Sequence, residues 1–376
     1  MIYSASRKTA TWPLFWAYVL VILYASLYPF DNWRFQSALS WAFLTDPWPR
    51  YWTGFDLFSN LVGYAPLGFL LTLAVHRSRR RWRGITLSVS AAAVLSLSME
   101  SLQMFLPVRV PSNLDIALNV LGAWMGAVLV QVMVWLGWIE RWGRFKDRWF
   151  EDETEASGAL ALLAVWPLAL LFPSPLPFGL GHVFERLESS WIEFLWGSPW
   201  LEWWPMRVLE LQPMTSTTAV LCMALGLLLP CLLAFGVVSR QPQRWAVAGV
   251  CLALGMLASA LSATLTYGPA HAWVWVSAEV GKAAVWAVAG VLALSWLAPS
   301  MCWALAVLAL VLQLSLLNSA PADAYFALTL QTWEQGRFIR FHGLIQWLGW
   351  LWPYALLAYL LSRLSSRDAG SPSPFR

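Results

Sequence analysis

The sequence predicts an all-α fold, a polytopic transmembrane helix bundle of about ten helices. Of its 376 residues, 59% are hydrophobic and only 12% are charged, whereas about 25% of residues are charged in an average soluble domain. The apolar residues form blocks of about 17 to 25, the length that crosses a hydrocarbon core of about 30 Å as a helix. These blocks are continuously apolar and do not alternate, so they predict helices and not the strands of a membrane barrel.

In chain order, the blocks predict helices at about 12–29, 56–75, 85–105, 115–137, 158–173, 216–238, 245–265, 273–296, 301–318 and 343–362. The first block follows Arg7 and Lys8 but is long and lacks a clear small-residue cleavage site, so we expect a retained signal anchor. The next three blocks carry polar residues near one end.

The six later blocks are almost free of charge, and Lys282 is the only Lys or Arg that falls inside a predicted helix. They contain the four cysteines, which show no CxxC or Cys/His ligand spacing and are expected to be small core residues. These are Cys222, Cys231, Cys251 and Cys302.

The distribution of basic residues predicts the orientation of the bundle. If the N-terminus is cytoplasmic, 16 Lys and Arg residues fall on the cytoplasmic side and seven on the opposite side. Cytoplasmic loops are enriched in Lys and Arg, so this split predicts cytoplasmic N- and C-termini. The basic residues are explained by topology, and we expect no nucleic acid partner. The predicted location is a bacterial cytoplasmic (inner) membrane, with membrane lipid as a partner; the sequence does not reveal the oligomeric state.

An acidic run, "EDETEASG" at 151–158, predicts a solvated cytoplasmic linker. It would divide the chain into a membrane unit of about four helices at 1–150 and one of about six helices at 159–376. The predicted outer loop at 174–215 is rich in tryptophan, with Trp191, Trp196, Trp200, Trp203 and Trp204. Such a loop either lies in the headgroup zone as an aromatic belt or stacks on sugar rings.

A polar constellation occupies the outer ends of the second, third and fourth predicted helices. Intramembrane ionisable residues are costly to insert and usually functional. The short connections make the three helices neighbours, so we expect their polar faces to converge in one outward-facing ligand-binding pocket. Its candidate residues are Asp56, Asn60, Glu100, Gln103, Arg109, Asp115 and Asn119. Glu100, Asp115 and Arg109 are the candidates for catalysis, and an ion-paired network that only joins the helices is the alternative.

Four further residues predict how these helices pack. Gly122 and Gly126 form a small-xxx-small step that permits close backbone approach. Pro66 and Gly68 are placed to break or kink the second helix just beneath the polar residues.

Two segments, "FDLFSNLVGYAPLGFLL" and "SMESLQMFLPVRVPSNLDIALNVLGAWMGA", resemble the VanZ-like family. The family pattern is N-x-x-x-x-x-P-L-G-F, then E-x-x-Q, a loop Arg, and D-x-x-x-N-x-x-G-x-x-x-G. The matching residues are Asn60, Pro66, Leu67, Gly68, Phe69, Glu100, Gln103, Arg109, Asp115, Asn119, Gly122 and Gly126. The resemblance covers 55–130. It implies a bacterial envelope membrane protein associated with low-level resistance to the glycopeptide antibiotic teicoplanin, and it implies no known reaction.

Motifs of well-known enzyme classes are missing from the sequence. There is no HExxH or other metal signature, no P-loop, no dinucleotide fingerprint and no G-x-S-x-G elbow. We therefore expect no cofactor and no metal, and the sequence excludes ATP-driven pumps and common hydrolases.

Three functions remain open. The first is an envelope protein that binds or handles an outer-leaflet or lipid-linked ligand through the polar pocket. The second is an integral membrane enzyme acting on a lipid-linked phosphate or glycan, with Glu100 or Asp115 as general base and Arg109 stabilising an anion. The third is a secondary transporter or flippase, for which ten helices interrupted by Pro and Gly would suffice.

Overall fold

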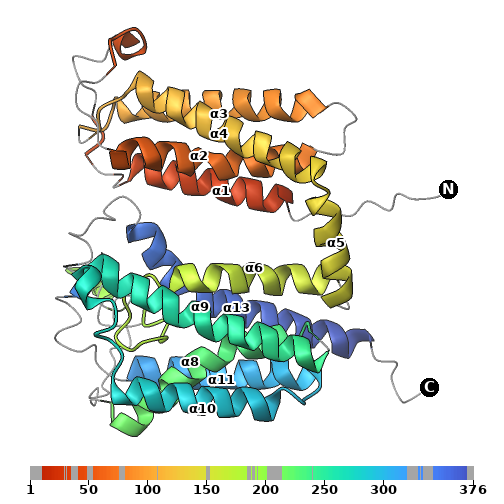
Figure 1. Cartoon of the computed structure of the whole chain (residues 1–376). Coiled ribbons are helices and arrows are strands. Elements are labelled where there is room, and N and C mark those ends of the chain that lie inside the picture. Colours follow the sequence, from red (N-terminus) through yellow and green to blue (C-terminus); the bar gives the residue numbers. More distant parts are fainter. Residues whose placement is uncertain are drawn as a thin grey trace. The chain divides into compact units, whose positions relative to one another are not determined.

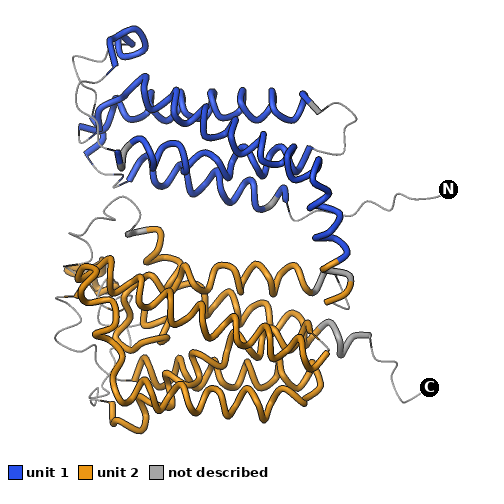
Figure 2. The backbone as a smooth tube through the Cα atoms, in the orientation of Figure 1, with its two compact units in different colours: residues 1–144 blue, residues 145–376 orange. Residues whose placement is uncertain are grey.

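The computed structural model describes residues 11–28, 30, 32–34, 41–48, 54–75, 81–107, 109–149, 153–183, 188, 191–192, 194–200, 214–238, 240–319, 329–330, 332 and 342–370. Within these residues the secondary structure is helical and contains no strand, so the predicted all-α class is confirmed (Figure 1). The chain divides into two compact units, Met1–Arg144 and Phe145–Arg376 (Figure 2).

The first unit is built around the contact between two helices, α2 (Gly54–Val75) and α4 (Asn113–Trp135). Helices α1 (Thr11–Leu27) and α3 (Arg81–Gln103) pack against α2, and α3 also packs against α4. A short 3₁₀ helix, η1, spans Trp41–Leu44. The apolar core of this unit includes Leu67, Leu71, Ala92 and Ala123.

The second unit is arranged around α8 (Ser216–Phe235), which packs against α6 (Glu153–Ala169), α9 (Gln241–Tyr267), α10 (Ala278–Leu294) and α11 (Pro299–Ser319). Helix α13 (His342–Gly370) packs against α6 and α11, and a 3₁₀ helix, η3 (Pro269–His271), follows α9.

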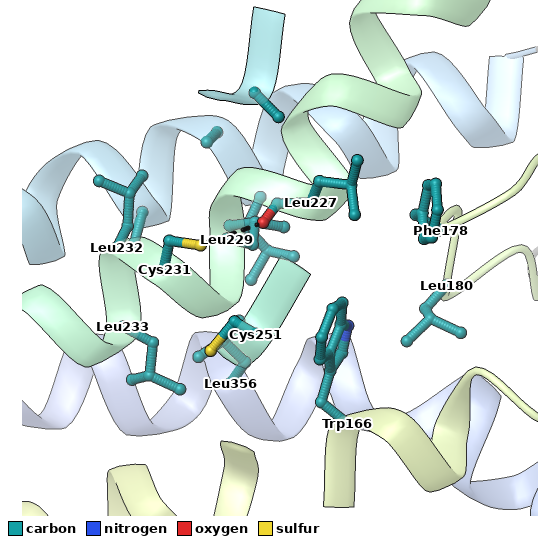
Figure 3. Close-up of a cluster of buried hydrophobic side chains, with 14 of the residues drawn as sticks. Trp166, Phe178, Leu180, Leu227, Leu229, Cys231, Leu232, Leu233, Cys251 and Leu356 are labelled. Atoms are coloured by element: carbon teal, nitrogen blue, oxygen red, sulfur yellow. Dashed lines mark hydrogen bonds between the residues drawn. The ribbon is translucent and has the colours of Figure 1, made fainter. Parts of the chain in front are cut away.

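The core of the second unit contains residues from many of these helices, including Trp166 of α6, Leu233 of α8 and Leu356 of α13 (Figure 3). All four cysteines are buried and unpaired, as the sequence predicted.

Each of the ten predicted helices has a counterpart in the structure. Within the described residues, seven helices are long and apolar enough to cross a membrane. Helices α1, α6 and α10 have 17 residues each. A helix of that length extends for about 26 Å, slightly less than a typical hydrocarbon core. The orientation of the termini stays a prediction.

The basic segment after α4 forms a helix where the sequence analysis placed a loop. This helix, α5 (Trp138–Trp149), follows a turn at Gly137, whose φ is +67°. Trp138, Trp142 and Phe145 are exposed along one face, and Arg141, Arg144 and Arg148 are exposed along the neighbouring face. Because α5 contains many charged residues, a search for apolar blocks does not identify it as a helix.

The acidic run at 151–158 also differs from the predicted linker, because α6 begins at Glu153 and includes the rest of the run. Acidic residues at a helix N-terminus are stabilised by the positive end of the helix dipole, so the same residues suit a helix start. In the tryptophan-rich segment, Trp191, Trp196 and Trp200 are exposed. Trp203 and Trp204 lie outside the described residues.

Arg244 is buried, although the sequence placed it among the cytoplasmic topology charges. Its guanidinium donates to the carbonyl of Phe235, the last residue of α8, at 2.9 Å, and to that of Val238, three residues later, at 2.6 Å. It also donates to those of Ser295 at 2.7 Å and Leu297 at 2.6 Å, at the end of α10. Helix C-termini leave carbonyls without partners and favour cations, so Arg244 joins two helix ends.

Candidate functional site

Glycine residues bring the backbones of α2 and α4 into direct contact. A Cβ atom added at Gly122 would overlap the carbonyl oxygen of Leu61, and one at Gly68 would overlap that of Ala123. A Cβ at Gly126 would lie 2.8 Å from the carbonyl carbon of Ala65 and 2.9 Å from the backbone nitrogen of Phe69. Close approach of this kind is the usual reason for small residues at membrane helix interfaces.

The side chain of Glu100, on α3, reaches the N-terminal end of α4. It is 3% exposed, and its carboxylate accepts the backbone N–H of Ser112 at 2.8 Å. Asp115 and Arg109 lie close enough to interact electrostatically with Glu100. Since a carboxylate can accept several hydrogen bonds, Glu100 retains acceptor capacity beyond this bond.

A second polar contact joins α3 to α4 on the same side of the unit. The amide of Asn119 donates to the hydroxyl of Ser96 at 2.9 Å, and both side chains are buried. Tyr64 of α2 is 5% exposed, and its hydroxyl faces Ser96 and Glu100. The three helices therefore place one polar cluster among them, and Asn60 is included because it lies one helical turn before Tyr64 on the same face of α2. We call it the α2–α4 polar cluster: Asn60, Tyr64, Ser96, Glu100, Ser112, Asp115 and Asn119.

Several polar atoms of this cluster are buried without a hydrogen-bond partner in the part of the chain that the structure describes. They are Nδ2 of Asn60, the hydroxyl oxygens of Tyr64 and Ser112, and Oδ1 of Asn119. Ser112 is the N-cap residue of α4, yet its side chain makes no capping bond. A buried polar atom without a partner costs about 1–3 kcal/mol, so four such atoms in one cluster require an explanation.

Two predicted site residues are directed to α1 instead. The amide of Gln103 donates to the carbonyl of Ser26 at 3.0 Å. Arg109 donates to the carbonyls of Tyr28 at 2.9 Å and Ala25 at 3.3 Å. These carbonyls belong to the C-terminal end of α1, where a cation is favourable. Gln103 and Arg109 therefore hold α1 in place beside the cluster.

Asp56 belongs to α2, but its side chain is outside the described residues. Pro66 lies within α2 and is half-buried. The structure thus brings together Glu100, Asp115 and Asn119 and adds Tyr64, Ser96 and Ser112, which sequence reasoning missed. Asn60 joins them only through its position one turn before Tyr64 on α2. The signal was present in the spacing, because Asn60 and Tyr64, Ser96 and Glu100, and Asp115 and Asn119 are each four residues apart on one helix face.

Among the residues that the structure describes, no three His, Cys, Asp or Glu side chains gather in a way that could hold a metal ion. One cavity lies within the second unit and is lined by none of the predicted site residues. It has a volume of about 320 Å³ and is bordered by α9 and the loop that follows α6.

The fold and the cluster together define a multi-pass α-helical membrane protein with a buried polar site in its N-terminal unit. Residues 15–134 match the model of the VanZ/LLP1 family, so the VanZ-like resemblance is confirmed for this part of the chain. The matched region includes α1 to α4 almost entirely and every described residue of the cluster. Comparison with curated proteins and with solved structures found no match.

Proposed function

We propose that the protein acts in the bacterial cytoplasmic membrane as a VanZ-like envelope protein, and that the α2–α4 polar cluster binds an outer-leaflet or lipid-linked envelope ligand. The observation that carries this proposal is the set of buried polar atoms without partners around Glu100. A structural network would satisfy its own hydrogen bonds, because each unmet bond lowers stability. A ligand group entering the cluster would satisfy them.

The chemistry of the unpaired atoms describes the ligand group. Glu100 and Oδ1 of Asn119 accept hydrogen bonds, so the ligand must supply donors such as hydroxyl or ammonium hydrogens. Nδ2 of Asn60 is a donor and needs an acceptor oxygen. Asp115 and Arg109 both lie near Glu100, so two carboxylates face one guanidinium, and the remaining negative charge favours a neutral or cationic group over an anionic one.

The capping role of Glu100 is the main competing interpretation. Its bond to the Ser112 N–H satisfies one of the free amides at the start of α4, which would be useful without any ligand. Capping, however, leaves the side chains of Asn60, Tyr64 and Asn119 unexplained, since none of them contributes to it.

The proposal is tested by mass spectrometry of lipids that copurify with the full chain, set against a lipid extract of the same membranes. We expect one lipid class to be enriched on the protein and to fall at least fivefold on E100Q and on D115N. S98A is the matched control, because Ser98 is exposed on α3 and bonds only to the carbonyl of Val94. The resistance phenotype is read in parallel as the inhibitory concentration of teicoplanin for host cells that express each variant.

An identical lipid profile for the parent, both cluster variants and S98A would refute ligand binding at the cluster. Normal membrane abundance of E100Q and D115N must accompany any loss, since a misfolded variant would lose lipid for another reason. Conversion of the copurified lipid into a new product by the parent, and not by E100Q, would assign the cluster to an enzyme instead. Proton- or sodium-dependent uptake in proteoliposomes would assign it to a transporter.

A further inference from the structure

A cavity of about 320 Å³ lies at the end of α9 in the second unit. One face of α9 forms a wall of it, because Ser259, Ser262, Thr266 and Tyr267 follow each other at helical spacing. The opposite wall is the proline-rich loop after α6, and the ring of Trp275 lies at the border. Its volume falls at the lower end of the range of about 300–1,000 Å³ typical of small-molecule sites.

The loop wall is held in one conformation from outside the cavity. Phe178 has a φ of +64°, a left-handed conformation that bulky residues rarely adopt. The amide of Gln313 donates to the Phe178 carbonyl at 3.1 Å, and a Cβ atom added at Gly226 of α8 would overlap that carbonyl. Strained backbone persists only where the surrounding structure fixes it, and it concentrates at binding sites. The cavity is therefore preformed.

The hydroxyl groups of Ser262 and Thr266 and the indole of Trp275 have already used their hydrogens. Ser262 donates to the carbonyl of Leu171 at 2.8 Å, and Thr266 donates to that of Ser262 at 2.9 Å. The indole N–H of Trp275 donates to the carbonyl of Ala272 at 2.9 Å. Each hydroxyl oxygen still has lone pairs, so this wall presents mainly acceptors and matches a ligand rich in donors.

The lining that the structure describes contains no Asp, Glu, Lys, Arg or His. Transfer of a charged group into such a site would cost several kcal/mol without a partner to offset it. Phosphate, ammonium and carboxylate headgroups are thus poorly matched. An uncharged group with several hydroxyls and an apolar side fits the acceptor oxygens and the aromatic rings.

The cavity also lies where two apolar helices end, and the ends of membrane helices are where lipid headgroups are expected. Helices α6 and α9 both end there, since the Ser262–Leu171 hydrogen bond joins the last turns of α9 to the residues just after α6. Trp273, beside the cavity residue Trp275, is 57% exposed, and tryptophan is enriched at membrane–water interfaces. A lipid could place its headgroup in the cavity while its chains stay in the bilayer.

We propose that this cavity binds the uncharged, hydroxyl-bearing headgroup of a membrane glycolipid, a single sugar ring linked to diacylglycerol. The site is separate from the α2–α4 polar cluster and does not depend on it. The sugar hydroxyls donate to the oxygens along α9, and an apolar face of the ring packs on the aromatic border.

The test measures lipid binding to the full-length protein by native mass spectrometry, in a polyoxyethylene detergent that carries no sugar. The probe is monoglucosyl diacylglycerol, compared with diacylglycerol, phosphatidylglycerol and the soluble sugar methyl glucoside. We expect the glycolipid to bind at least tenfold more tightly than either other lipid. We also expect methyl glucoside to bind at least tenfold more weakly than the glycolipid, because it lacks acyl chains.

Two variants on opposite faces of α9 localise the binding. S259L fills the cavity with an apolar side chain and should weaken glycolipid binding at least tenfold, because the half-buried Ser259 borders the cavity. L261M is the control on the exposed face, at 48% exposure, and should bind as the parent does. W275L, which removes an aromatic border, should weaken glycolipid binding and leave the affinity for diacylglycerol unchanged.

Equal affinity for the glycolipid and diacylglycerol would overturn recognition of the sugar. Tighter binding of phosphatidylglycerol would overturn the inference of an uncharged ligand, and equal affinity for methyl glucoside would overturn a lipid ligand. Unchanged binding to both S259L and W275L would place the glycolipid elsewhere. Protection of the four buried thiols from alkylation shows that each variant is folded, because these cysteines belong to the same unit.

Discussion

Replacing Gly126 with alanine tests whether α2 and α4 pack backbone to backbone. The new Cβ would lie 2.8 Å from the carbonyl carbon of Ala65 and 2.9 Å from the Phe69 nitrogen. Both distances are well below the separation of about 3.5–4.0 Å at which non-bonded carbon atoms attract one another. The obstacle is backbone and cannot rotate away, so the helices must separate by roughly 1 Å, a gap that forfeits a quarter to a half of each contact energy.

The expected magnitude follows from two opposing effects. Alanine in place of glycine favours a helix interior by about 1 kcal/mol. Overpacking of a close interface typically costs about 1–3 kcal/mol and sometimes more. Because the clash here is with two backbone groups, we expect G126A to lower the free energy of unfolding of the first unit by about 2 kcal/mol.

Gly63 provides the matched control on α2, because a Cβ there would meet nothing within 4 Å. G63A should leave the stability unchanged or raise it by up to about 1 kcal/mol. Unfolding is followed as alkylation of a reporter thiol, S88C, during titration with dodecyl sulfate, since Ser88 is buried in α3. The four native cysteines all belong to the second unit, and their alkylation midpoint should not move. A G126A midpoint equal to or above that of G63A would refute the backbone contact.

Three further outcomes follow from other contacts. R244M should destabilise the second unit by about 3 kcal/mol, because it leaves four carbonyls at helix ends without their charged donor. The control is R240M, which replaces an exposed side chain and should change the stability by less than about 0.5 kcal/mol. Similar alkylation midpoints of the native thiols in both variants would contradict this. N318A should speed backbone amide exchange in the loop after α6, because the Asn318 side chain donates to the carbonyl of Gly181 at 3.2 Å and accepts from the N–H of Val183 at 3.3 Å. Unchanged exchange would show that the loop does not depend on Asn318. Helix α5 should lie on the membrane surface, with its aromatic face toward the lipid. A nitroxide label at position 142 should then be more accessible to oxygen, and a label at position 140 should be more accessible to an aqueous nickel complex. Equal accessibility of the two labels to both reagents would show that α5 does not lie on the membrane surface.

The positions of the apolar helices could be predicted because a membrane-spanning helix requires an apolar composition over a window of about 20 residues. Helix α5 was not predicted from the sequence, because its 12 residues alternate Trp and Phe with Arg and resemble a charged loop. The start of α6 at Glu153 was not predicted either, because acidic residues suit both a linker and a helix N-terminus.

The candidate site was predictable where it contains unusual charges. Glu100 and Asp115 are conspicuous in an apolar helix, and the structure places them close together. Ser and Tyr residues are common in membrane helices, so the four-residue spacing of Ser96 from Glu100 and of Tyr64 from Asn60 gains meaning only beside the three-dimensional arrangement. The partners of Gln103 and Arg109 are backbone carbonyls, which have no signature in the sequence.

The glycine contact between α2 and α4 restricts how a ligand could reach the polar cluster. Two helices whose backbones touch cannot slide or part without losing the whole seam, so they move as one rigid pair. The C-terminal end of α1, by contrast, is joined to the loop after α3 by three hydrogen bonds from Gln103 and Arg109 to carbonyl oxygens. These bonds come from side chains, and water could donate to the same carbonyl oxygens in their place. The α1 end is therefore joined to the site by side-chain hydrogen bonds, whereas α2 and α4 are joined by direct backbone contact.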